Sequence, residues 1–116
     1  MRKKYRTKYG NRKTVIDGIT FDSMKEANHY AELRLLEKAG EISDLELQSP
    51  FVLQPGFAHK GQKYQPIKYV ADFVYLDKDG ARVVEDVKSP ATRKDKVYQL
   101  KKKMMLYVHG IEIKEI

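Results

Sequence analysis

Two short segments decide how this chain folds: Tyr69-Val70-Ala71-Asp72-Phe73-Val74-Tyr75 and Val83-Val84-Glu85-Asp86-Val87-Lys88. Both are apolar, β-prone runs, and the short Lys78-Asp79-Gly80 connection between them predicts a β-hairpin. Ionisable side chains lie near the centre of each run, although an uncompensated charge in an apolar strand is costly. Two carboxylates and a lysine held in one hairpin therefore indicate a divalent metal beside a cation, the arrangement of a hydrolytic site.

The turn determines the register of this hairpin. A three-residue loop over 78–80, with Gly80 in the left-handed conformation that glycine accepts without strain, places Asp72 opposite Asp86. The period-2 alternation of strands then puts Asp72, Asp86 and Lys88 on one face. We therefore predict that these three side chains form the candidate catalytic group.

A different turn would exchange the two acidic residues of the second strand. A two-residue turn places Glu85, instead of Asp86, opposite Asp72, and we favour the three-residue loop because glycine suits its third position. In the favoured register Glu85 faces the other side of the hairpin. A buried, unpaired glutamate is expensive, so we expect Glu85 to have a basic or hydroxyl partner.

Each candidate residue also has an ordinary structural interpretation. Asp72 alternatively faces water, and Asp86 with Lys88 alternatively forms a surface ion pair of little energetic value. Glu26, in the sequence Ser23-Met24-Lys25-Glu26, fits a helix capping box, in which its side chain would bind the backbone of Ser23. The helical angles also allow Glu26 to point at the sheet and complete a metal site.

Composition limits the class of protein. A chain of 116 residues with 41% hydrophobic residues supports one domain, and no segment reaches the roughly 20 apolar residues of a membrane span. No signal peptide is visible after the charged N-terminus. The absence of cysteine excludes disulfides and thiolate metal sites and is compatible with the cytoplasm. Any metal must therefore bind oxygen or imidazole, and clustered carboxylates favour Mg²⁺ or Mn²⁺.

The net charge of +7 is unevenly distributed. Seven basic residues precede the first acidic one and, with interleaved tyrosines, predict a nucleic-acid-binding arm over 1–13, ahead of a single domain over 14–116. A solvated tail is the alternative. A second basic cluster occurs at 93–103, and lysines also occur in the long connection at 55–65. The candidate DNA-binding residues outside the second cluster are Arg2, Lys3, Lys4, Arg6, Lys8, Arg12, Lys13, Lys60 and Lys63.

The first predicted elements are a tight hairpin or a bent strand at 15–21, a helix at 24–39 that Asp22 or Ser23 caps, and a strand at 45–53 that Pro50 bends or confines to an edge. The hairpin of 68–88, a helix at 95–109 and a strand at 111–116 follow. Their order predicts an α/β fold with a mixed sheet. Apolar stripes indicate which helix residues are buried. These residues are Met24, Ala27, Ala31 and Leu35 in the first helix, and Val97, Leu100 or Lys101, Met104 and Val108 in the second, with Tyr30, Tyr98 and Tyr107 as further core candidates.

An Asp in one strand, an Asp-X-Lys in its hairpin partner and a preceding helix that carries Glu26 resemble the PD-(D/E)XK nuclease superfamily. Val70-Ala71-Asp72-Phe73 is similar to its first acidic motif, with alanine in place of proline, and Asp86-Val87-Lys88 is similar to its (D/E)XK element. The stretches 23–47, 68–88 and 98–105 more closely resemble a small phage and prophage-encoded family within that superfamily.

The resemblance implies a restriction-endonuclease-like core, a mixed central sheet flanked by helices, and Mg²⁺-dependent hydrolysis of DNA. It implies that Asp72, Asp86, Glu26 and the carbonyl of Val87 hold the metal, while Lys88 positions water or neutralises charge. Lys102 or Gln99 on the second helix would touch the scissile phosphate.

Small nucleases of this superfamily include Holliday junction resolvases, so we expect a structure-selective enzyme that cuts branched DNA as a homodimer, in a bacterial host cytoplasm. The alternatives are a sequence- or mismatch-directed nuclease and a non-catalytic DNA-binding protein on the same fold.

Overall fold

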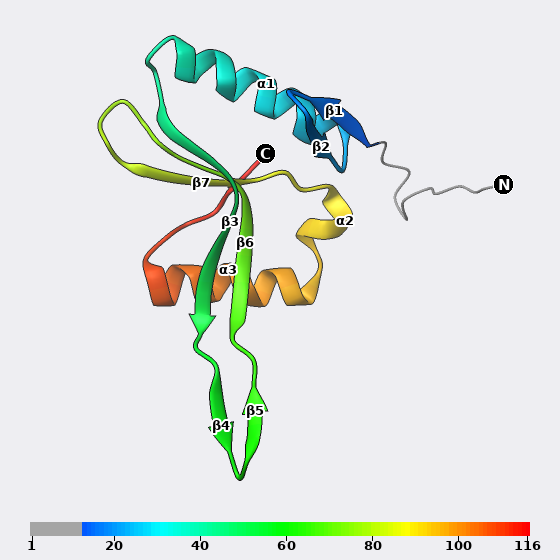
Figure 1. The fold of residues 1–116 in the computed structure, drawn as a ribbon, viewed down its shortest axis with the longest axis vertical. Coiled ribbons are helices and arrows are strands. Elements are labelled where there is room, and N and C mark those ends of the chain that lie inside the picture. The colour runs from blue at the N-terminus through cyan, green and yellow to red at the C-terminus, as the bar shows by residue number, and fades with distance from the viewer. Residues whose placement is uncertain (1–12) are drawn as a thin grey trace, which may run out of the picture. The chain divides into compact units, whose positions relative to one another are not determined.

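The computed structural model describes residues 13–116, which fall into two compact units with the boundary between Ile42 and Ser43 (Figure 1). The first unit contains β1 (Thr14–Ile16), β2 (Ile19–Phe21) and α1 (Met24–Lys38). The second contains β3 (Ser43–Gln54), β4 (Phe57–His59), β5 (Gln62–Tyr64), β6 (Ile67–Leu76), β7 (Arg82–Asp86), α2 (Pro90–Arg93), α3 (Lys96–His109) and β8 (Lys114–Glu115). No helix of the described residues is long and apolar enough to cross a membrane.

The first unit is a tight hairpin followed by a capped helix. Strands β1 and β2 pair antiparallel around a turn in which Asp17 and Gly18 both have positive φ, as a two-residue hairpin loop requires. Ser23 is the N-cap of α1, and its hydroxyl accepts a hydrogen bond from the backbone N–H of Glu26 at 3.1 Å. The predicted hairpin and helix are therefore confirmed, with Ser23 and not Asp22 as the N-cap.

The buried face of α1 differs from the predicted apolar stripe. Glu26, Ala27, Tyr30 and Leu33 are buried, whereas Met24 and Leu35 are 55% and 68% exposed. The predicted stripe is confirmed for Ala27 and wrong for Met24 and Leu35, because it followed apolar character alone. Tyr30 is instead the residue that connects the helix to the hairpin, since its hydroxyl donates to Asp17 at 3.0 Å and its ring packs on Phe21.

A four-stranded mixed sheet organises the second unit, with the strand order β3-β6-β7-β8. The pairs β3–β6 and β6–β7 are antiparallel, and β7–β8 is parallel. The α/β class and the mixed sheet are therefore confirmed. Pro50 lies in β3, at one edge of the sheet, where a missing N–H is tolerated.

The β6–β7 hairpin has the predicted register. Phe73 pairs with Glu85 and Leu76 with Arg82, so the pairing that continues from them sets Asp72 opposite Asp86. Gly80 has a φ of 83°, and the three-residue loop is closed by a hydrogen bond from the Asp77 N–H to the Ala81 carbonyl at 2.8 Å. Asp77 further fixes the turn, because its carboxylate accepts from the N–H groups of Asp79 and Ala81.

Helix α3 packs against β3 and β6 and contributes Tyr98 and Met105 to the core. Of the residues that the sequence predicts for this face, Met104 packs partly buried against the core, whereas Val97, Leu100 and Val108 are 60%, 54% and 46% exposed. The core prediction for the tyrosines holds for Tyr30 and Tyr98 and is wrong for Tyr107, which is 91% exposed. The helix boundaries are as expected, with Asp95 as N-cap and Gly110 at a φ of 67° as C-cap.

The connection at 55–65 contains an element that sequence analysis missed. Strands β4 and β5 form a separate two-stranded hairpin around Lys60 and Gly61. The last predicted strand is also shorter than expected, because only Lys114–Glu115 pairs as β8.

Candidate active site

Asp72 and Asp86 interlock across the end of the β6–β7 ladder. The ladder ends with the pair Phe73 and Glu85, and beyond this pair the Asp72 N–H donates to Asp86 Oδ1 at 2.9 Å. In return, the N–H of Val87 donates to Asp72 Oδ2 at 3.0 Å. Each carboxylate therefore accepts a backbone donor from the other strand, which satisfies these N–H groups and fixes both side chains.

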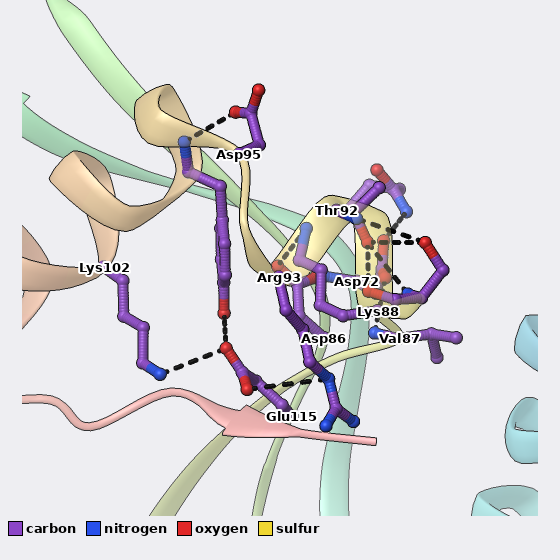
Figure 2. Close-up of polar contacts among 12 residues, drawn as sticks. Asp72, Asp86, Val87, Lys88, Thr92, Arg93, Asp95, Lys102 and Glu115 are labelled. Atoms are coloured by element: carbon purple, nitrogen blue, oxygen red, sulfur yellow. Dashed lines mark hydrogen bonds and ion pairs between the residues drawn. The ribbon is translucent and has the colours of Figure 1, made fainter.

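Asp86 is the buried member of the pair, with 1% of its surface exposed, and Asp72 is half-buried. Burial raises the pKa of Asp86, and the nearby Lys88 charge opposes that rise. The Lys88 ammonium lies 3.3 Å from Asp86 Oδ2 (Figure 2). The three residues that the hairpin pattern predicts thus form one group, and the interpretation of Asp86 and Lys88 as a surface ion pair is excluded for Asp86 by its burial.

The Tyr98 ring contacts Lys88, and polar contacts around Glu115 in turn hold Tyr98. Its Nζ lies 4.3 Å from the centroid of the Tyr98 ring, a cation–π distance, and the Tyr98 hydroxyl donates to Glu115 at 2.5 Å. Glu115 also pairs with Lys102 at 3.1 Å and with Arg93 at 3.7 Å, as Figure 2 shows. The hydrogen bond from Tyr98 lowers the pKa of Glu115, so this carboxylate stays ionised.

Gln48 is a site residue that sequence analysis missed. Its side-chain amide donates to Asp72 Oδ1 at 3.1 Å from the neighbouring strand β3, and its φ is 52°. A neutral amide orients the Asp72 carboxylate without cancelling its charge. No local pattern could reveal this role, because Gln48 is 24 residues from Asp72 in the sequence.

Glu85 occupies the other side of the hairpin, as predicted. It is 1% exposed, accepts a hydrogen bond from the Tyr75 hydroxyl at 2.6 Å and pairs with Lys114 at 3.6 Å. Both a hydroxyl and a basic partner are therefore present. Burial, assisted by Glu85, raises the pKa of Tyr75, so the phenol remains the donor.

The remaining predicted site residues belong to the first unit, to the β4–β5 hairpin or to the part of the chain outside residues 13–116. Glu26 is buried in the first unit, and its part in a metal site stays a prediction. Lys13 pairs with Asp22 at 3.8 Å, and Lys60 and Lys63 belong to the β4–β5 hairpin. The predicted DNA-binding residues that lie outside the described part of the chain are Arg2, Lys3, Lys4, Arg6, Lys8 and Arg12.

The Asp72–Asp86 group supplies some of the oxygen ligands that a hard divalent cation needs. Asp86 Oδ2 is buried and accepts no hydrogen bond of good geometry from residues 13–116, so it keeps ligand capacity beside the Lys88 charge. Two carboxylates are the oxygen donors that Mg²⁺ and Mn²⁺ select, and Mg²⁺ keeps several water ligands. Within the described ranges, however, no group of three or more histidine, aspartate or glutamate side chains could hold a metal.

Alkaline pH provides a test of the tyrosine contacts. Burial raises the pKa of Tyr98, with the Glu115 hydrogen bond and charge adding to the effect, so the folded protein keeps this proton after the unfolded chain loses it. The unfolded state then binds fewer protons above about pH 10, and the free energy of unfolding should fall by about 1.4 kcal/mol per pH unit for this tyrosine. Urea unfolding at pH 9, 10 and 11 should show a shallower fall in Tyr98→Phe, and equal slopes would contradict the contact.

The fold and the site together define a small mixed α/β protein that gathers two aspartates and a lysine where two antiparallel strands separate. The family described as "Protein of unknown function (DUF1064)" matches residues 6–114, and the chain belongs to that family. No curated protein and no solved structure matches the chain.

Proposed function

We propose that this protein is a Mg²⁺- or Mn²⁺-dependent DNA endonuclease with a restriction-endonuclease-like core. One observation carries the proposal: buried Asp86, its cross-strand partner Asp72 and the Lys88 ammonium, 3.3 Å from Asp86, form one group at the end of the β6–β7 hairpin. Carboxylates with an adjacent cation suit phosphodiester hydrolysis, because they hold a metal while the cation faces the negative charge that develops on phosphate.

Each residue has a distinct role in the proposed mechanism. Asp72 and Asp86, with the carbonyl of Val87, would hold the metal, which when bound supplies Lewis-acid stabilisation and lowers the pKa of water. Lys88 would position the attacking water and stabilise the phosphate oxygens. Gln48 would keep the Asp72 carboxylate in its orientation, through the 3.1 Å hydrogen bond from the neighbouring strand.

Branched DNA is the proposed substrate, by analogy with small resolvases of the PD-(D/E)XK superfamily. Paired cuts on such a substrate need two sites, so a homodimer of the chain is part of the proposal, as is a phage or prophage origin in a bacterial cytoplasm. The net charge of +7 supports a polyanionic partner.

A non-catalytic DNA-binding protein on the same fold is the second candidate. The observation that favours it is the small number of carboxylates, since the described residues bring together no group of three metal-ligating side chains. The two candidates differ in whether the protein cleaves DNA at all, because both predict binding.

The deciding experiment incubates the full chain with labelled four-way junction, Y-fork and linear duplex, each with Mg²⁺ or with EDTA. Paired symmetric nicks in the junction alone, lost with EDTA, are the expected result. Cleavage of all three substrates would retain the nuclease and reject the junction preference. Tight binding with no cleavage under either condition would reject the enzyme and favour the second candidate.

A further inference from the structure

The β4–β5 hairpin extends beyond the ends of β3 and β6 as a narrow two-stranded arm, as Figure 1 shows. Phe57 pairs with Tyr64 and His59 with Gln62, and every residue from 54 to 65 is exposed. A lone two-stranded hairpin is marginally stable in water. Contacts within the arm must therefore maintain its shape. A role in binding would explain why its residues are exposed.

Two features stiffen the arm along its length. The rings of Phe57 and Tyr64 stack with centroids 4.8 Å apart and an angle of 9° between their planes. At the base, a Cβ on Gly56 would lie 3.0 Å from the Tyr64 carbonyl oxygen and 3.3 Å from the ring of Pro66, so any side chain there would push these neighbours apart. The two strands of the arm therefore approach each other closely at its base, where glycine leaves room for the neighbouring backbone.

The tip of the arm presents a lysine in an unusual conformation. Lys60 and Gly61 have φ values of 50° and 80°, which make the two-residue turn that matches strand twist. A non-glycine residue with positive φ is uncommon, and asparagine or aspartate is the usual choice at this position. The chain thus places a positive charge where the backbone favours a neutral or acidic residue.

The charge of the arm is of one sign. The chain has no aspartate or glutamate from Leu47 to Ala71, and over this range it carries Lys60, Lys63 and Lys68 together with His59. This composition departs from the mixed charge of the whole chain, which has 16 acidic residues in 116. A basic, exposed arm with an apolar ring pair has the charge and chemistry of a surface that binds a polyanion.

We propose that the β4–β5 hairpin is a duplex-DNA-binding arm that lies in the major groove, with Lys60 and Lys63 at the phosphates and the Phe57–Tyr64 ring pair against thymine methyl groups and sugars. The inference rests on the proposed function for the identity of the polymer, and is independent of the hydrolytic chemistry. The groove follows from dimensions, since the B-form major groove, about 12 Å wide, admits a two-stranded ribbon. The narrow major groove of duplex RNA does not.

The first test measures binding without cleavage, using the full chain with Asp86→Asn in EDTA and a fluorescent 25-base-pair DNA duplex. The added double substitution Lys60→Ala with Lys63→Ala should weaken binding about tenfold or more near 0.15 M salt. The negative slope of log K against log salt should become shallower by about 1.8. The matched control removes two lysines elsewhere, Lys38→Ala with Lys78→Ala, and should change the affinity less than about threefold on the same scale. Circular dichroism checks that all variants are folded.

The second test reports on the arm itself. The chain has no tryptophan, so Tyr64→Trp introduces a single tryptophan, which can be excited selectively, at a position that is 42% exposed. Its emission should be quenched by the DNA duplex, and by much less with an RNA duplex of the same sequence. The parent could bind the duplex while the lysine substitutions have no effect and the tryptophan does not respond. That result would overturn the proposal that the arm binds DNA and would leave the proposed function intact. Failure of the parent to bind either this duplex or a four-way junction would overturn both the arm and the proposed function. Tighter binding to duplex RNA would overturn the groove assignment.

Discussion

Asp86→Asn should abolish Mg²⁺-dependent cleavage, by about 10³-fold or more, on the scale seen when one catalytic electrostatic group is lost. The reason is the position of the charge, because Asp86 Oδ2 is the buried carboxylate oxygen that faces the Lys88 ammonium at 3.3 Å. Asparagine keeps the volume and an oxygen that can accept the Asp72 N–H, but loses the negative charge. The variant should therefore fold and bind DNA as the parent does.

The measurement pairs cleavage with thermal stability. Mg²⁺ or Mn²⁺ should raise the melting temperature of the parent relative to EDTA, since a ligand that binds only the folded state stabilises it, and should not do so in Asp86→Asn. Asp79→Asn, in the exposed β6–β7 turn, is the matched control and should keep both cleavage and the metal response. Full cleavage by Asp86→Asn would show that this carboxylate is not part of the reaction.

Glu85→Ala should instead destabilise the protein, by about 3 kcal/mol, and leave the chemistry of the remaining folded molecules unchanged. Glu85 is 1% exposed and binds the Tyr75 hydroxyl at 2.6 Å and Lys114 at 3.6 Å. Its removal leaves a buried hydroxyl without that acceptor and a cavity between β7 and its neighbours. Of the two adjacent acidic residues in β7, Glu85 would thus contribute to stability and Asp86 to catalysis.

Urea unfolding measures the loss, with cleavage rates normalised to the folded fraction. Glu112→Ala is the control, because Glu112 is an exposed glutamate near the same end of the chain and its removal should cost less than about 0.5 kcal/mol. If Glu85→Ala lost cleavage without losing stability, the catalytic role would move from Asp86 to Glu85 and the assignment of their sides would be reversed.

The hairpin and its register could be predicted because they depend on residues close in the sequence. Gly80 supplies the positive φ of the turn, and the turn alone sets which residues pair across the strands. The caps of α1 and α3 were predictable for the same reason, since Ser23 and Asp95 bind backbone groups three residues away.

The buried faces of the helices were not predictable in this way. Leu35 and Leu100 are exposed, whereas Tyr30 and Tyr98 are buried, because each tyrosine ring packs while its hydroxyl reaches a carboxylate distant in the sequence. The β4–β5 hairpin has only a weak local signal, the Lys60-Gly61 turn between Phe57 and Tyr64, and the range 55–65 is therefore predicted as a connection.

Asp72, Asp86 and Lys88 could be grouped from residue spacing, because two-residue alternation and one turn bring them together. The contacts around them come from long-range packing, which sets Gln48 on Asp72 and the Tyr98–Glu115 pair beside Lys88. Long-range packing also decided that β8 joins the sheet parallel to β7. Contacts between distant segments leave no periodic signal in a single chain, since they depend on how the elements pack and not on the spacing of residues within any one of them.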